Sequence, residues 1–179
     1  MADNRRPVTK LKETVTTSTV HGKYCLWFAW APEGVPGPEG ETVDADYLPL
    51  EVDVAGIQAV RVTAVPTDEW WHHPGNKSNA GGLSTTRDLQ NDDYRSDTYR
   101  SKKIDTLKAK LNLLVGMLGP DPDTPPTSPV SQIEIGLGED ITIDNIADTR
   151  LYLGFHDGHE WSNNGGSVNV SIEILKKRD

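Results

Sequence analysis

The sequence predicts an all-β protein, an antiparallel β-sandwich of about eight strands. Two observations carry this prediction. Apolar and polar residues alternate over several short segments, which is the pattern of strands with one buried face. The chain also has 16 Gly and 12 Pro among 179 residues, a density that suits many turns better than a bundle of helices. Because this length is typical of one domain, we expect a polar tail over residues 1–12 and a single sandwich over 13–179.

Each expected strand has its own local signal. Residues 14–20 are rich in Thr and Val, and residues 23–30 are aromatic, so both segments favour strands, with a turn at His21 and Gly22. Period-two alternation predicts the remaining strands over 50–54, 60–64, 133–137, 141–143, 151–155 and 168–174. Where Gly, Pro and polar residues interrupt the alternation, long loops are expected over 32–40, 66–100 and 119–130.

One segment has helical rather than strand periodicity. Apolar residues recur three or four positions apart, with lysines between them, at Ile104, Leu107, Leu111, Leu114 and Leu118. This spacing predicts one short helix near residues 101–110. The second half of the segment, 111–118, also alternates as a strand would, so the pattern there fits either a helix or a strand.

The composition disfavours several classes of partner. The chain has 27 acidic and 18 basic residues, whereas proteins that bind nucleic acids or anionic membranes are usually basic. Cys25 is the single cysteine, so neither an intramolecular disulfide nor a four-cysteine zinc site is expected. No run of 18 apolar residues predicts a transmembrane helix. Because the N-terminus has no apolar leader segment, we expect a protein that is cytoplasmic or released without a classical signal peptide.

The segment 155–166 is the densest polar stretch, and it joins two expected strands as a tip loop. Its carboxylate and amide groups are hard oxygen donors of the kind that calcium takes, whereas its two imidazoles favour a transition metal such as zinc. A third interpretation needs no ligand, because Asn and Gly also supply positive φ and local hydrogen bonds in hairpin loops. The candidate side chains are His156, Asp157, His159, Glu160, Asn163 and Asn164.

Two stretches around this loop carry a family resemblance. Residues 151–157 read LYLGFHD and residues 163–172 read NNGGSVNVSI. This pattern resembles the signature of the PA-I-like lectins, small calcium-dependent galactose-binding proteins of bacteria with a jelly-roll sandwich fold. Weaker matches over 52–62 and 113–119 are similar to further strands of that family, so the resemblance extends over 45–175. It implies a jelly-roll-like, galactose-binding-domain-like sandwich in which the last of these weaker matches is a strand.

The resemblance also implies a calcium site. Asp157 matches the residue that bridges the calcium ion and a sugar hydroxyl, and Asn163 and Asn164 match the paired asparagine ligands. Main-chain carbonyl ligands are expected from the same loop and from an aromatic residue of an earlier loop. The candidates for these carbonyls are Trp161 or Glu160 and Trp71 or Trp70.

The same resemblance implies which residues contact the sugar. Asp157 and Asn163 match residues that bind sugar hydroxyls. The pair His73 and Pro74, with Asn76 nearby, matches a His-Pro pair beside the sugar in this family. The loop between Asp157 and Asn163 is one residue shorter than the family pattern.

The predicted function is non-catalytic, calcium-dependent binding of a galactose-type carbohydrate. Because single sites of this kind bind weakly, a homo-oligomer is expected to gain affinity through multivalency. Two alternatives stay open: a metal-dependent enzyme at His156, Asp157, His159 and Glu160, and a sandwich with a structural or assembly role. Against the enzyme, strand alternation directs His156 and Asp157 to opposite faces. The sequence also has no Gly-x-Ser-x-Gly elbow, P-loop or Gly-x-Gly-x-x-Gly fingerprint.

Overall fold

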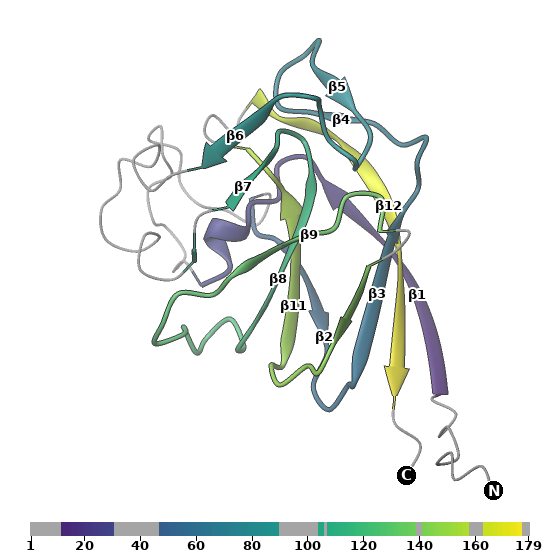
Figure 1. Ribbon diagram of the computed structural model, residues 1–179, viewed down its shortest axis with the longest axis vertical. Coiled ribbons are helices and arrows are strands. Elements are labelled where there is room, and N and C mark those ends of the chain that lie inside the picture. The colour runs from purple at the N-terminus through teal and green to yellow at the C-terminus, as the bar shows by residue number, and fades with distance from the viewer. Residues whose placement is uncertain are drawn as a thin grey trace, which may run out of the picture.

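The regular secondary structure is almost entirely β in the parts of the chain that the computed structural model describes (Figure 1). The described residues are 12–30, 47–89, 104–105, 107–138, 141–157 and 163–176. The predicted loop over 32–40 and residues 1–11 of the predicted tail lie outside them. The elements are β1 (Lys12–His21), η1 (Leu26–Phe28), β2 (Leu50–Asp53), β3 (Ala59–Ala64), β4 (Trp70–Trp71), β5 (Lys77–Ser78), β6 (Thr86–Leu89), β7 (Leu107–Lys110), β8 (Leu114–Gly119), β9 (Gln132–Glu134), β10 (Thr142–Asp144), β11 (Arg150–Phe155) and β12 (Gly165–Lys176).

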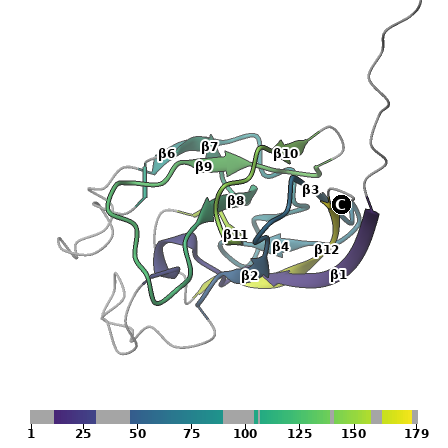
Figure 2. The ribbon, with the colours of Figure 1, turned by 90° about the horizontal axis from the view of Figure 1, so that it is seen from below.

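The strands form two antiparallel sheets, which confirms the predicted sandwich. In the first sheet the order is β10-β3-β12-β4-β5, and β1 pairs with the other side of β12. The second sheet has the order β2-β11-β8-β9, and β6 and β7 form a separate hairpin. Figure 2 looks along the strands, with β1, β12 and β3 curving around one side of the sandwich and β2, β11 and β8 facing them.

The central strands of the second sheet, β11 and β8, are buried on both faces because each face packs against its own core. Leu151, Leu153 and Phe155 of β11 pack into the core between the two sheets, whereas Tyr152 packs into a second core. Successive side chains of β11 therefore pack into different cores on opposite faces of the sheet, and the strand is buried nearly throughout. The buried members of the second core are Cys25, Leu26, Phe28, Ala29, Trp30, Ile104, Ala109, Leu113, Val115, Met117 and Tyr152.

The predicted helix near 101–110 is wrong over its second half, because Leu107–Lys110 form strand β7. β7 pairs with β6, and its burial alternates, with Ala109 inside and the two lysines outside. The apolar residues at helical spacing belong to separate elements. Ile104 forms an isolated bridge with Val130, Leu107 lies in β7, and Leu114 and Leu118 lie in β8, with Leu111 in the turn between the two strands.

The aromatic segment 23–30 is not the predicted strand either. It forms turns and the 3-10 helix η1, and five of its residues are buried in the second core: Cys25, Leu26, Phe28, Ala29 and Trp30. Gly154 allows this segment to cross close to β11, because a Cβ at that position would lie 2.8 Å from the carbonyl oxygen of Tyr24. A continuous apolar run has no period, so it does not distinguish a strand from a buried turn.

Two predicted loops are partly ordered into β-structure. The described part of 66–100 contains three short strands, β4, β5 and β6. The loop predicted over 119–130 connects β8 to β9, with Gly119 as the last residue of β8.

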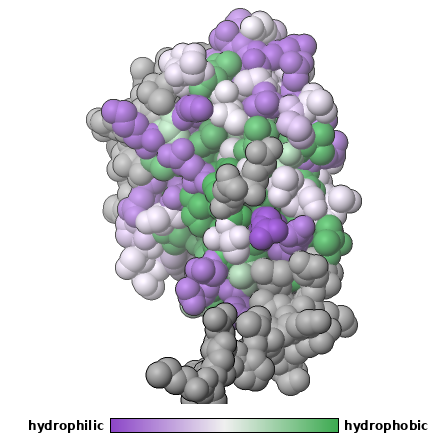
Figure 3. Space-filling view, turned by 45° about the vertical axis from the view of Figure 1, so that its right-hand side comes forward, coloured by the Kyte–Doolittle hydropathy of each residue, from purple (hydrophilic) through white to green (hydrophobic). Residues whose placement is uncertain are grey.

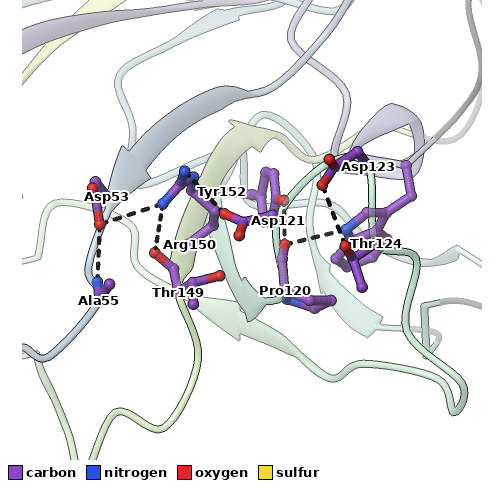
Figure 4. A network of polar contacts seen from close by, with 10 residues as sticks. Asp53, Ala55, Pro120, Asp121, Asp123, Thr124, Thr149, Arg150 and Tyr152 are labelled. Carbon is purple, nitrogen blue, oxygen red and sulfur yellow. Dashed lines mark hydrogen bonds and ion pairs between the residues drawn. The ribbon is translucent and has the colours of Figure 1, made fainter.

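A network of ion pairs joins the lower end of the second sheet, where β2 and β8 end and β11 begins (Figure 4). The guanidinium of Arg150 lies 2.9 Å from Oδ1 of Asp121 and 3.3 Å from Oδ1 of Asp53. The hydroxyl of Tyr152 donates to the carbonyl oxygen of Pro120 at 2.6 Å. Burial is the main cause that raises the pKa of Tyr152, so the hydroxyl keeps the proton that it donates.

Candidate functional site

The segments predicted to form the site meet at the upper end of the sandwich, where β11 ends, β12 begins and the β4–β5 turn lies (Figure 1). β12 pairs with β4 in a register that sets Gly165 opposite Trp71 and Gly166 opposite Trp70. The two asparagines at 163–164 directly precede this pairing. The fold therefore brings the predicted asparagine ligands next to the aromatic strand that was expected to supply a carbonyl ligand.

The two glycines that open β12 have a packing role. A Cβ at Gly165 would lie 2.6 Å from Cζ2 of Trp71, and Gly166 has a φ of +75°. The half-buried indole of Trp71 therefore packs directly against the glycine backbone. Trp70 is fully buried, and its ring meets that of Phe155 edge to face at 4.8 Å. Trp70 therefore belongs to the core, whereas Trp71 lies at the surface of the protein.

Asn112, which the sequence did not single out, joins the separate segments of the upper end. It is fully buried, with a left-handed backbone (φ +59°). Its side-chain amide donates to the carbonyl oxygen of Asn76 at 2.7 Å, and its Oδ1 lies 2.7 Å from Nδ1 of His72. Its carbonyl accepts from Nε1 of Trp70 at 2.9 Å, and its N–H donates to the carbonyl of His156 at 3.1 Å. Asn112 thus fixes the β4–β5 turn against the end of β11.

His156 is buried against the main chain of β7. Its Nδ1 lies 2.9 Å from the carbonyl oxygen of Lys110, and its Nε2 lies 3.3 Å from that of Leu107. Burial lowers the pKa of His156, although the two carbonyl contacts oppose this shift. Both ring nitrogens face main-chain carbonyls, so metal coordination would require the loss of one of these contacts. His159 and Glu160, the other members of the alternative metal cluster, lie outside the described residues.

Two of the three side chains expected to bind calcium are buried, and the third, Asn163, is half-buried. Asp157 has 5% of its surface exposed, and Asn164 has 4%. The Nδ2 of Asn164 donates to the carbonyl oxygen of Gly22 at 3.1 Å, which orients the amide. Its Oδ1 is also buried and accepts no hydrogen bond from any described residue. Since a buried carbonyl oxygen without a donor costs about 1–3 kcal/mol, this oxygen is suited to a cation or water.

The other predicted site residues have varied settings. His73 and Pro74 are exposed in the β4–β5 turn, in the same turn as Asn76. The Nζ of Lys77 lies 5.4 Å from the centre of the Trp71 ring, so this indole has a cationic neighbour as well as glycines. Trp161, the loop residue expected to supply a carbonyl, lies outside the described residues.

A surface hollow next to the paired asparagines was not predicted. It has a volume of about 340 Å³ and is lined by His21, Lys23, Tyr24, Gly165 and Gly166. The rings of His21 and Tyr24 meet edge to face at 5.0 Å. The glycine pair in the sequence was the available signal, because residues without side chains leave room beside a strand.

No protein-family model, curated protein or solved structure matches the chain. In the described part of the chain, no group of three or more His, Cys, Asp and Glu side chains could hold a metal ion. Amide and carbonyl oxygens, on which the predicted calcium site depends, are not among those groups. The described residues also contain no helix that is long and apolar enough to cross a membrane.

Proposed function

We propose that this protein is a calcium-dependent carbohydrate-binding protein without catalytic activity, and that its ligand is a galactose-type sugar. The observation that carries the proposal is the buried Oδ1 of Asn164, which no described donor reaches. This oxygen lies in the paired-asparagine segment, which the fold sets beside Trp71 of β4. The other proposed ligands are Asp157 and Asn163, which flank the segment 158–162.

The donor chemistry supports calcium over a transition metal. Calcium takes six to eight oxygen ligands, from carboxylates, amides, main-chain carbonyls and water. Asp157, Asn163 and Asn164 supply one carboxylate and two amide oxygens, and the carbonyls of Trp71 and Trp161 are the proposed main-chain ligands. The contacts of both imidazole nitrogens of His156 with main-chain carbonyls favour this proposal over a zinc or iron enzyme.

The sugar would complete the coordination of the metal. Two neighbouring sugar hydroxyls can replace calcium-bound water, oxygen for oxygen, so their desolvation costs little. Asp157 and Asn163 would also bind these hydroxyls, and His73, Pro74 and Asn76 would contact the sugar from the β4–β5 turn. Hydrophilic residues gather over this upper end of the molecule, as Figure 3 shows, and a polar ligand would suit that surface. The preference for galactose rests on the family resemblance.

A glycan array tests the proposal. The chelator-treated protein, with calcium added back, is expected to bind galactose-terminated glycans, and EDTA is expected to abolish this binding. Asn76→Ala should weaken sugar binding because its exposed side chain is a proposed sugar contact. Asn145→Gly is the matched control, because it removes an exposed asparagine at the end of β10, near the start of β3, and keeps the left-handed backbone.

Two outcomes would overturn the proposal. One is binding to glycans that EDTA leaves unchanged, since calcium would then have no part in recognition. The other is an absence of binding to every glycan with calcium present, which would leave a structural or assembly role for the domain.

A further inference from the structure

Strand β1 is a long edge of the first sheet. It has ten residues, and among the described residues it pairs only with β12. Figures 1 and 2 show it along one border of the sandwich. An edge strand leaves one row of main-chain N–H and C=O groups without strand partners, which makes it a template for another strand.

The pairing with β12 establishes which residues direct their main-chain groups to this free edge. The N–H of Gly22 donates to the carbonyl of Gly166, so position 22 is a hydrogen-bonded position toward β12. In an antiparallel ladder such positions alternate along the strand. The even-numbered residues of β1 therefore bond to β12, and Val15, Thr17 and Thr19 direct their N–H and C=O groups outward.

The free edge lacks the usual protection against pairing. Proteins blunt edge strands with charged residues, Pro, bulges or short length. Residues 14–20 read TVTTSTV, with no charge and no Pro, and β-branched residues of this kind favour strand pairing. Val15 has 58% of its surface exposed, more than any other large hydrophobic residue in the described part of the chain.

We propose that two copies of this chain associate through the free edges of β1, antiparallel and about a two-fold axis at Thr17. Thr17 is the centre of the uncharged stretch 14–20. This register sets Val15 of each copy opposite Thr19 of the other, so exposed apolar surface becomes buried. Because residues 14–20 carry no charge, the central pairs of this register oppose no like charges.

The association joins the first sheets of the two copies into one continuous sheet. Because the two β1 strands run antiparallel, the upper ends of the copies lie at opposite ends of the dimer. The pairing itself requires neither calcium nor sugar, so it can fail or hold independently of the proposed function.

Sedimentation equilibrium of the full chain in EDTA tests this association. The wild-type protein should be a dimer, and Thr17→Lys should raise the dimer dissociation constant at least about tenfold, because two lysines would meet at the two-fold axis. Thr63→Lys is the matched control, since Thr63 and Thr17 both pair with Ser171 and lie on the same outer face, but Thr63 is away from the edge. The control should remain a dimer.

Amide hydrogen exchange by NMR supplies a second readout. In the wild-type protein the N–H groups of Val15, Thr17 and Thr19 should be protected, and Thr17→Lys should release that protection without changing the even-numbered amides of β1. A monomeric wild-type protein would overturn the proposal, even if those amides are protected, since another part of the same chain would then cover the edge. A dimer that Thr17→Lys does not weaken would overturn it as well.

Discussion

Polar clusters lie at the two ends of strand β11, and they differ in the ion pairs and hydrogen bonds that their oxygen atoms make. At the lower end, the guanidinium of Arg150 lies within ion-pair distance of the carboxylates of Asp53 and Asp121. At the upper end, the buried Oδ1 of Asn164 accepts no hydrogen bond from a described donor. The lower carboxylates therefore have a described counter-charge, although the buried Oγ1 of Thr149 beside them accepts no described hydrogen bond. The upper cluster contains a buried amide oxygen that no described donor reaches and that belongs to the proposed calcium site.

This difference separates a stabilising network from a candidate binding site. Groups that compensate one another contribute to folding and gain nothing from a ligand. Buried oxygen atoms in excess of the available donors cost stability until something binds them. Changes at the lower end should therefore alter stability alone, and changes at the upper end should alter stability and ligand binding together.

The largest effect on stability is expected at Asn112. Asn112→Ala removes two partly buried side-chain hydrogen bonds of a buried residue and puts a residue without a polar side chain at φ +59°. The free energy of unfolding should fall by about 2–4 kcal/mol. Urea denaturation measures this loss, and calcium and sugar binding should weaken in the same variant, because the β4–β5 turn would no longer be fixed against β11.

Asn145→Ala is the control for the backbone contribution. Asn145 has a similar φ of +53° but is exposed, so its replacement should cost only about 1 kcal/mol. Equal losses for the two variants would show that the hydrogen bonds of Asn112 contribute nothing beyond backbone strain.

His156, at the upper end, should make the free energy of unfolding depend on pH. Burial lowers its pKa below the ordinary value of 6.5, so the unfolded chain binds the proton more readily than the folded chain. The free energy of unfolding therefore includes a contribution from the neutral His156 that is complete above pH 6.5. This contribution decreases as the pH falls from 6.5 toward the pKa of the folded state. Its size is about 1.4 kcal/mol for every tenfold difference in proton affinity between the folded and unfolded chains. Thermal unfolding of His156→Gln between pH 7.5 and 5 should show a weaker decrease than the wild-type protein. Identical slopes would contradict the burial of a neutral imidazole.

A smaller effect is expected at the lower end. Arg150→Met keeps the aliphatic stem but removes the ion pairs with Asp53 and Asp121, whose side chains are 72% and 43% exposed. Because solvent screens such pairs, the loss should be about 1 kcal/mol. Arg61→Met, which removes the surface pair with Glu173, should cost about 0–0.5 kcal/mol. Calcium binding should not change in either variant, and a change in Arg150→Met would contradict the separation of the two ends.

The sequence predicted most strands of the two sheets because those strands have a polar face or alternate between apolar and polar residues. The failures lie where that signal is absent or misleading. Residues 25–30 form a continuous apolar run, so they have no period, and five of them pack into the second core. Ile104 and Leu107 fall at helical spacing by coincidence, since they pack into that core from a bridge and from β7.

The candidate site was predictable only in part. The pattern of Asp157 and the paired asparagines indicated oxygen donors, and in the fold the asparagines directly precede the residues of β12 that pair with β4. Asn112 could not be predicted because its partners are distant in sequence. A single polar residue in the apolar run 111–114 was its only signal. Apart from Gly, Asn is among the residues that most readily adopt a left-handed backbone. The hollow at Lys23 depends on the turn after β1 meeting β12, which no local pattern specifies.

Calorimetric titration of the chelator-treated protein with calcium chloride tests the central claim most directly. The wild-type chain should bind about one calcium ion, and Asp157→Ala should bind none at the same concentrations. Asp123→Ala, which removes an exposed carboxylate at the lower end, should bind calcium as the wild-type chain does. An absence of calcium binding in the wild-type protein, or binding that Asp157→Ala leaves unchanged, would contradict a calcium site at the upper end.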